Sequence, residues 1–247
     1  MTLVWRPGFQ FDADASTYIE AVEVADTQAL ETGVRYAIND FVIGCKNDGI
    51  WNAIKASCIL AGARTLNGAL VPLVGTAPTN FNFVAGDYNR ETGLVGDGTT
   101  KYLDSNRNNN ADPQDNQHLA AWASESLGFK HYMGTLYSIT GTSNISHVGF
   151  RSRTTVAETV PITPQENFNA LSRNNASNFE VRVANTSTIG TFSSNLPADQ
   201  SITIFGQHPT ILTPSRLAFY SIGESLDLAA LDTRVSTLIT AIGAAIP

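Results

Sequence analysis

Residues 93–124 read GLVGDGTTKYLDSNRNNNADPQDNQHLAAWAS, and this stretch decides the fold class. Its glycines predict a tight turn, which is followed by a strand at residues 102–104. The segment 104–116 is rich in Asn, Asp and Pro, which are the ordinary residues of turns. A second strand is predicted at 118–124, so the stretch describes two strands joined by a polar connection.

The same sequence pattern extends from about residue 60 to residue 222, where Gly, Thr, Ser and Asn separate short runs of apolar and β-branched residues. The segment FEVRV at 179–183 alternates most clearly, with the period of two that a half-buried strand needs. Strands are predicted at residues 69–74, 102–104, 118–124, 132–138, 147–153, 179–184, 201–205 and 217–222. Many short strands with few helices predict a mainly β protein, built as a sandwich or jelly roll.

Helices are predicted on both sides of this β-rich part. Between residues 27 and 59, apolar side chains recur at spacings of 4, 4 and 3, which place them on one face of a helix. They are Leu30, Val34, Ile38 and Phe41. A short second helix is predicted at 50–54, and a similar stripe predicts a closing helix near the C-terminal end. That stripe consists of Leu231, Val235, Leu238 and Ile242.

The chain therefore divides into an N-terminal arm at 1–26, a helical lead-in at 27–60, and a sandwich with its closing helix at 61–247. The arm combines aromatic residues with Pro and Gly and shows little periodicity, which predicts an extended segment. We expect Trp5, Phe9 and Phe11 to dock on a partner chain. The alternative is an ordinary first strand.

Composition excludes several classes of protein. Charged residues make up 15% of the chain and the net charge is −7, whereas nucleic-acid binding needs a basic surface. No apolar run has the length of a membrane span, and no signal peptide is apparent, so we expect synthesis and folding in a cytoplasm. Cys45 and Cys58 are expected to be reduced, half-buried thiols.

Oxygen-bearing side chains in the loop raise the hypothesis of a calcium site. The candidate ligands are Asp104, Asn106, Asn108, Asp112 and Asp115. Their spacing matches several ligand positions of a helix–loop–helix calcium loop, but position 6 is Asn109 instead of Gly, and the last ligand is an Asp instead of the longer Glu. Both interpretations stay open, and we expect the polar connection. No other cofactor is expected.

A second hypothesis concerns sugar binding, which uses aromatic faces with planar polar side chains around them. The loop at 79–89, TNFNFVAGDYN, carries Phe81, Asn82, Tyr88 and Asn89, which we take as candidate glycan ligands. The alternative is that these aromatic residues belong to the core. Trp51 and Trp122 are assigned to the core.

Catalytic patterns are not apparent. Glycoside hydrolysis needs a pair of carboxyl groups, and no E-x-D-x-x-E pattern occurs. Glu180 is a lone strand acid, and Glu224 with Asp227 precedes the last helix, where acids favour the helix dipole. The histidines His118, His131, His147 and His208 are dispersed, with no HExxH spacing. We expect no enzymatic activity.

Three segments resemble a known family. The first, AINDFVIGCKNDGIWNAIKASCILAGA at 37–63, resembles the helical lead-in of phage and prophage tail-associated proteins through its core CKNDGIW at 45–51. The second is the stretch at 93–124, which resembles the strand–loop–strand segment of concanavalin A-like (laminin G-like) domains. The third, RLAFYSIGESLDLAALDTRV at 216–235, is similar to the last strand and the helix that follows it in that family.

The resemblance implies a two-sheet antiparallel concanavalin A-like jelly roll with N-terminal helices and a C-terminal helix. It also implies a virion surface protein of a tailed phage, assembled in the host cytoplasm. The expected role is tail-associated, as a tail fibre or receptor-binding protein that contacts host surface glycans. A capsid decoration protein is the alternative, and a glycan-active hydrolase is a third. By analogy we expect a homotrimer that contacts other virion proteins.

Overall fold

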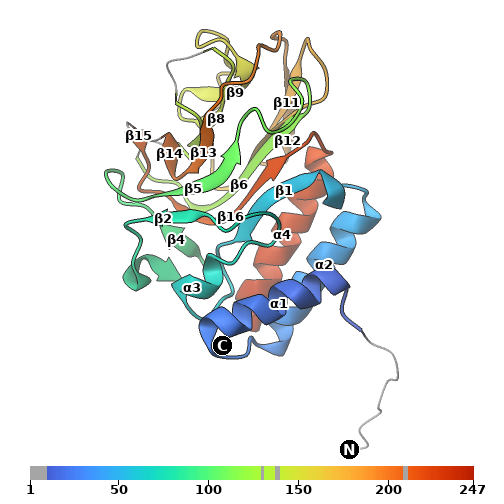
Figure 1. Ribbon diagram of the computed structural model, residues 1–247, viewed down its shortest axis with the longest axis vertical. Helices are drawn as coiled ribbons and strands as arrows, with labels where there is room; N and C mark the ends of the chain where they lie inside the picture. The colour runs from blue at the N-terminus through green and yellow to red at the C-terminus, as the bar shows by residue number, and fades with distance from the viewer. Residues whose placement is uncertain (1–9, 129–130, 137–139, 208–210) are drawn as a thin grey trace, which may run out of the picture.

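Two antiparallel sheets lie face to face, and helices α2 and α4 cover the outer face of the larger sheet, with α1 against α2 (Figure 1). The computed structural model describes residues 10–128, 131–136, 140–207 and 211–247. The helices are α1 (Ala13–Asp26), α2 (Thr32–Asn47), α3 (Leu66–Ala69) and α4 (Leu228–Ala245), with short 3-10 turns η1 (Trp51–Ala53) and η2 (Ala85–Asp87). The sequence prediction of a mainly β sandwich with N-terminal helices and a C-terminal helix is confirmed.

The larger sheet has the strand order β12-β11-β10-β6-β16-β4-β3, and β1 also pairs with β16. Its strands are β1 (Ile54–Ile59), β3 (Tyr88–Asn89), β4 (Gly93–Val95), β6 (Gln117–Glu125), β10 (Asn167–Arg173), β11 (Phe179–Val183), β12 (Thr186–Gly190) and β16 (Arg216–Gly223). The smaller sheet has the order β2-β5-β13-β7-β8-β9. Its strands are β2 (Thr79–Phe81), β5 (Tyr102–Asn108), β7 (Met133–Gly134), β8 (Thr142–Ser146), β9 (Gly149–Thr154) and β13 (Ser201–Ile204). A two-stranded antiparallel sheet of β14 (Gly206–Gln207) and β15 (Ile211–Leu212) is separate from both.

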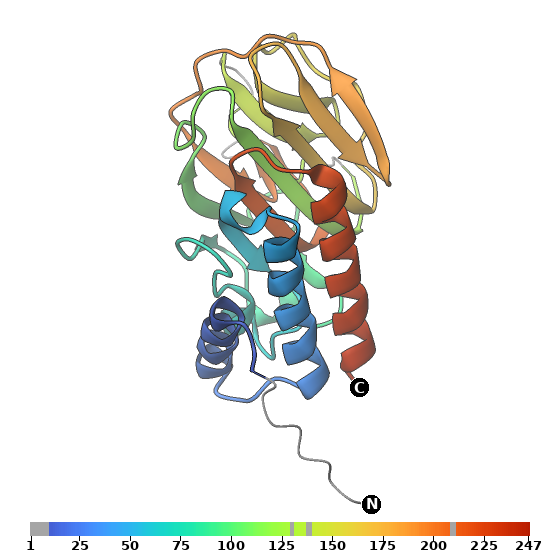
Figure 2. The ribbon, with the colours of Figure 1, turned by 90° about the vertical axis from the view of Figure 1, so that its right-hand side faces the viewer.

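Strand β6 separates two apolar cores because its successive side chains point to opposite faces. Leu119 and Ala121 face the core between the sheets, whereas Ala120 faces the helices. On the helix side, Phe41 of α2 meets Phe219 of β16 edge to face, with ring centroids 5.8 Å apart. The molecule is thus three-layered, as the side view also shows (Figure 2).

The N-terminal region differs from the expected extended arm, because residues 13–26 form helix α1. Its buried side chains, Ala15, Tyr18, Ile19 and Val22, recur at helical spacing. Asp12 caps the helix by accepting from the Asp14 amide. The Pro, Gly and aromatic residues that suggested an arm fall upstream of this amphipathic stretch, mostly in residues 1–9, which lie outside the described residues.

Two further sequence predictions are wrong. The second helix expected at 50–54 is only the turn η1, and β1 then pairs along β16, with Ser57 opposite Ser221. Strand β1 is buried on both faces, and its sequence IKASCI has small residues at its centre, which weakens the alternation of apolar and polar residues that distinguishes a half-buried strand. The segment 69–74, expected to be a strand, instead begins at the last residue of the short helix α3 and forms a single bridge, between Val74 and Ser57.

Helix α4 closes the helical layer. Within the described residues it is the one helix long and apolar enough to cross a membrane, by length and composition alone. In the fold its apolar stripe packs against α2 and β10. Asp227 caps its start by accepting from the amides of Ala229 and Ala230.

Candidate functional site

Phe81 and Tyr102 form a stacked aromatic pair at the edge of the smaller sheet. Strand β2 is the edge strand, and its register with β5 places Phe81 directly opposite Tyr102. The two rings lie 4.3 Å apart between centroids and only 9° from parallel. Leu103 points into the core between the sheets, so alternation turns Tyr102 and Asp104 outward. Phe81 keeps 37% of its surface exposed, so the pair is partly open to solvent. We call this pair the aromatic platform.

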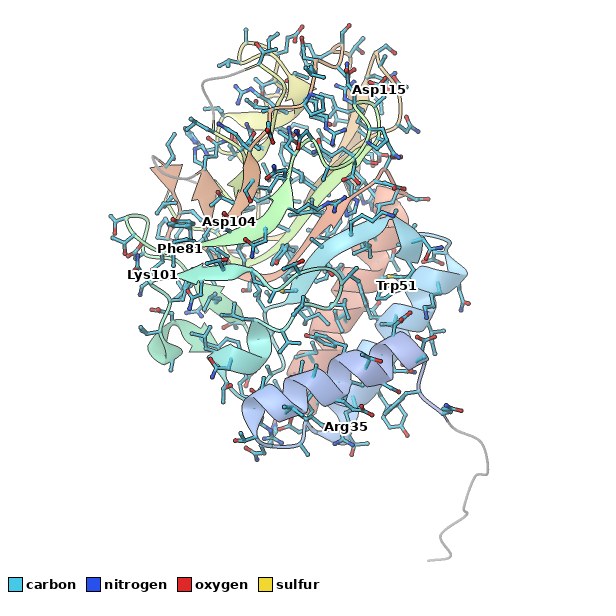
Figure 3. The ribbon with its side chains drawn as sticks, viewed as in Figure 1. Arg35, Trp51, Phe81, Lys101, Asp104 and Asp115 are labelled. Carbon is cyan, nitrogen blue, oxygen red and sulfur yellow. The ribbon has the colours of Figure 1, made fainter. Side chains whose placement is uncertain are left out.

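Polar side chains around the aromatic platform are held in fixed positions. Lys101 forms an ion pair with Asp87 at 2.5 Å. Asn82, whose φ of 67° is left-handed, donates its amide to the carbonyl of Thr100 at 2.8 Å. Figure 3 shows Phe81, Lys101 and Asp104 gathered in one part of the molecule. The platform therefore combines an apolar ring face with ordered hydrogen-bonding groups nearby.

The turn before β5 is rigid because Asp97 organises it. Its carboxylate accepts from the backbone amides of Thr99, Thr100 and Lys101, and from the Thr100 hydroxyl. Burial would raise the pKa of Asp97, but these hydrogen bonds outweigh burial and lower that pKa well below its usual range. Partial burial, and then the charge of Asp104, raise the pKa of Tyr102. The Tyr102 hydroxyl is therefore neutral at physiological pH.

The four residues predicted to bind glycans do not all meet. Phe81 and Asn82 lie at the aromatic platform, whereas Tyr88 and Asn89 belong to β3 of the other sheet. The Tyr88 hydroxyl donates to the carbonyl of Ala63, and burial raises its pKa. Asn89 accepts from the amides of Glu91 and Thr92, which is the ordinary role of an Asn in a turn.

Sequence reasoning missed Tyr102 as a member of the platform. The signal was present in the alternation of TKYLD, which turns Tyr102 to the face opposite Leu103. What the sequence did not contain was the pairing of β2 with β5, and only that pairing sets Phe81 against Tyr102.

The five predicted calcium ligands are spread along β5 and the loop that follows it. Asn108 lies four positions after Asp104 along the strand, which is roughly 13 Å at the usual rise. Figure 3 shows Asp104 and Asp115 far apart. Asp104 accepts from Ser201, and Asp112 forms an ion pair with Arg107. The remaining contacts join Asn106 to Ala77, Asn108 to Asp199 and Asp115 to Ser194.

A buried arginine donates hydrogen bonds to the backbone of this loop. Arg153 is fully buried, and its guanidinium donates to the carbonyls of Asn109 at 2.6 Å, Asn116 at 3.4 Å and Pro113. Burial lowers the pKa of Arg153 to about 10, so it remains charged near neutral pH. Gln117 also donates to Asn109 at 2.6 Å. The loop carbonyls that a metal ion would use are thus bonded to a cation of the protein itself.

Other ionisable groups are buried as structural members. Among the described residues, no group of three or more His, Cys, Asp and Glu side chains comes together as a metal site would require. His118 lies between the Glu224 carbonyl at 2.6 Å and the Ser221 hydroxyl at 2.7 Å, and burial lowers its pKa to about 4. Burial raises the pKa of the free thiols of Cys45 and Cys58 to about 12.

The acids considered for catalysis each have a structural contact. Glu180 accepts from Ser187 at 2.6 Å, and Glu224 forms an ion pair with Lys55 at 3.2 Å. Asp227 caps α4. None of these contacts resembles a carboxyl pair facing a shared substrate position.

The predicted docking residues fall mostly outside the structural description. Trp5 and Phe9 lie among residues 1–9, which are not described. Phe11 packs edge to face on Tyr36 of its own chain, with ring centroids 5.4 Å apart. Phe11 therefore anchors the start of the described chain to α2.

No family model matches this sequence, and no curated protein matches it. Solved structures similar to it include a sialidase and a domain of an arabinanase. One is a mutant of Trypanosoma rangeli sialidase displaying trans-sialidase activity, with a TM-score of 0.50 and 11% identity over 84% of this chain. The other is domain 4 of AbnA, a GH43 extracellular arabinanase from Geobacillus stearothermophilus, in complex with arabinotriose. Its TM-score is 0.42 with 9% identity, over 65% of this chain and 82% of that chain.

These similarities concern the fold. This chain spans 39% of the length of the sialidase chain, and at 11% identity the likeness shows a shared architecture alone. The arabinanase similarity, with its TM-score below 0.5, carries no argument about this chain. Together with the two antiparallel sheets, the sialidase similarity identifies a β-sandwich of the jelly-roll kind.

Proposed function

We propose that this chain is a non-enzymatic surface protein of a tailed-phage virion, attached to the tail, that contacts host glycans through the aromatic platform. The exposed, parallel stack of Phe81 on Tyr102 is the observation that carries the glycan contact. A sugar ring has an apolar C–H face that packs on an aromatic ring, while its hydroxyls need fixed polar partners. Asn82, Asp104 and the Lys101–Asp87 ion pair supply such partners near the rings.

The virion assignment rests on the resemblance of three segments, the first to phage tail-associated proteins and the other two to concanavalin A-like domains. In the structure these segments form one continuous part of the fold. Strand β1, from the first segment, pairs with β16 from the third, and helix α2 packs against α4. The second segment supplies β6, which pairs with β16 on its other side. The three segments that carry the resemblance are thus in contact with one another. A homotrimer and contacts with other virion proteins follow from the same resemblance.

The non-enzymatic role is supported by how the acids are used. Glu180, Glu224 and Asp227 are engaged in a strand contact, an ion pair and a helix cap. A hydrolase would instead need two carboxyl groups set about 5 Å apart, or somewhat further, on either side of a bond to be cleaved.

A glycan array probed with the labelled full chain tests the glycan contact. We expect binding to a subset of bacterial surface glycans, and a loss of about tenfold in affinity in Phe81→Ala, which corresponds to about 1.4 kcal/mol. Ile189→Ala is the matched control, because Ile189 is an exposed apolar residue on the edge strand of the other sheet. Equal binding by both variants and the unmodified chain would contradict the platform.

Cryo-electron microscopy of intact particles tests the location. We expect density for the sandwich at the tail, with the aromatic platform directed away from the particle. Density on the capsid lattice would instead support the decoration role and would contradict tail attachment.

A further inference from the structure

A groove runs along Trp51, in the region where α1, η1 and β1 meet. Two adjoining hollows of about 370 and 360 Å³ share Asp14, Trp51 and Asn52 in their walls. Each volume lies in the range of ligand pockets, roughly 300–1,000 Å³. Figure 3 shows Trp51 well away from Phe81, so this groove is separate from the aromatic platform. We call it the Trp51 groove.

The Trp51 ring is fixed in place before any ligand arrives. Its indole N–H donates to the carboxylate of Asp14 at 3.2 Å. The ammonium of Lys46 lies over the ring, 5.7 Å from its centroid. The ring packs partly against the helix-side core, while part of it remains exposed. A rigid aromatic surface loses little conformational freedom when a ligand binds to it.

Both ammonium groups along the Trp51 groove are paired with carboxylates of the protein. Lys46 lies 2.6 Å from both Asp12 and Asp14. Lys55 lies 3.2 Å from Glu224. An anionic ligand would have to compete with these carboxylates, and a cationic ligand with these ammonium groups. The groove therefore favours an uncharged ligand.

The walls combine apolar surface with hydrogen-bonding groups. Tyr18, Pro72 and Leu73 supply apolar surface, and Asn52 presents an exposed amide that can both donate and accept. We propose that the Trp51 groove binds a neutral sugar residue, whose apolar ring face lies on Trp51 and whose hydroxyls bond to Asn52 and Asp14. This inference concerns a site distinct from the aromatic platform and does not depend on glycan binding there.

Titration of the full chain with neutral trisaccharides tests this inference. The probes are maltotriose, cellotriose and chitotriose, with trigalacturonate as the anionic comparison, and binding is read by tryptophan fluorescence and calorimetry. We expect saturable binding of at least one neutral probe, and no tighter binding of trigalacturonate. Asn52→Ala should lower the affinity of the chain for the neutral probe by about tenfold. Because Asn52 is exposed, this variant should fold, whereas Trp51→Ala would also disturb core packing.

Two controls separate the Trp51 groove from other sites. Asn110→Ala removes another exposed amide and should leave binding unchanged, whereas Phe81→Ala reports on binding at the aromatic platform. The inference is overturned if no neutral probe binds below about 10 mM, or if Asn52→Ala and Asn110→Ala behave alike. It is also overturned if a peptide of residues 1–10 binds in the groove and the sugars do not. Loss of binding in Phe81→Ala alone would instead assign that binding to the platform.

Discussion

Both ends of strand β5 lie in sequence that is rich in polar residues, but these residues have different roles at the two ends. At the Tyr102 end, the aromatic platform faces solvent at the edge of a sheet. Beyond Asn108, the loop at 109–116 turns its carbonyls onto the buried guanidinium of Arg153. We call these the open end and the closed end of β5. A ligand can bind only to groups that the fold leaves accessible. The number of oxygen atoms in a loop does not show which groups these are.

The largest predicted effect is at the closed end. Arg153→Met should lower the free energy of unfolding by about 3 kcal/mol, because three carbonyls in a buried region lose their donor. Urea denaturation at pH 7 measures it. Lys101→Met at the open end is the matched control, and removing its partly exposed ion pair should cost no more than about 1 kcal/mol. Equal losses in the two variants would remove the distinction between the ends.

A second prediction concerns pH at the closed end, where His118 lies next to Gln117. Burial lowers the pKa of His118 to about 4, compared with about 6.5 in an unfolded chain. Protonation therefore favours the unfolded state, and stability that is complete above pH 6.5 is lost as the pH falls toward 4. Between pH 7 and pH 5 the loss should be roughly 2 kcal/mol.

The variant His118→Gln isolates this contribution, because an amide can still donate to the Glu224 carbonyl and accept from Ser221. Unfolding midpoints at pH 7 and pH 5 should differ less in the variant than in the unmodified chain. His131 also has a pKa lowered to about 4, by burial and then by His147 and Arg151, so part of the pH dependence should remain. An unchanged pH dependence in His118→Gln would contradict the assignment.

The open end should contribute little to stability. A double-mutant cycle with Phe81→Ala and Tyr102→Ala should give a coupling free energy of about 0.5–1.5 kcal/mol, as expected for a stacked aromatic pair. Thermal or urea unfolding of the four proteins measures it. A coupling of 3 kcal/mol or more, on the order of the predicted Arg153 effect, would mean that the platform is built for stability.

The smallest expected effect is that of calcium. A site in the loop filled at one hundred times its dissociation constant would add about 2.7 kcal/mol of stability. Arg153 already donates a hydrogen bond to a carbonyl oxygen of the loop, and Arg107 pairs with the carboxylate of Asp112. We therefore expect equal unfolding midpoints in millimolar calcium and in EDTA. A rise with calcium that disappears in Asp112→Asn would reopen the metal hypothesis and erase the contrast between the two ends.

Much of the fold could be predicted from the sequence. Strands with a clear period of two, such as β11, were placed to within a residue, and the stripes of α2 and α4 were found because their apolar spacing is regular. Strand β1 was missed because the small residues at its centre weaken its alternation. Helix α1 was missed because its buried stripe, which includes Ala15 and Tyr18, mixes a small and an aromatic residue among acids.

The candidate site was less predictable, since it depends on pairing between distant segments. Phe81 and Asn82 were identified, but Tyr102 becomes their neighbour only through the register of β2 with β5. The role of Arg153 was also invisible, because 40 residues separate it from Pro113. Side chains that meet through long-range contacts leave no local trace in the sequence.

The pairing of β1 with β16 has a consequence for how the chain is made. Strand β1 must wait for a partner more than 150 residues downstream, and α2 must wait for α4. Contacts so distant in sequence slow folding, because the conformational entropy of closing a long loop is lost before the contacts form. During synthesis the apolar face of α2 would stay uncovered until residues 216–245 had been translated, so this half of the molecule should be the part that chaperones engage.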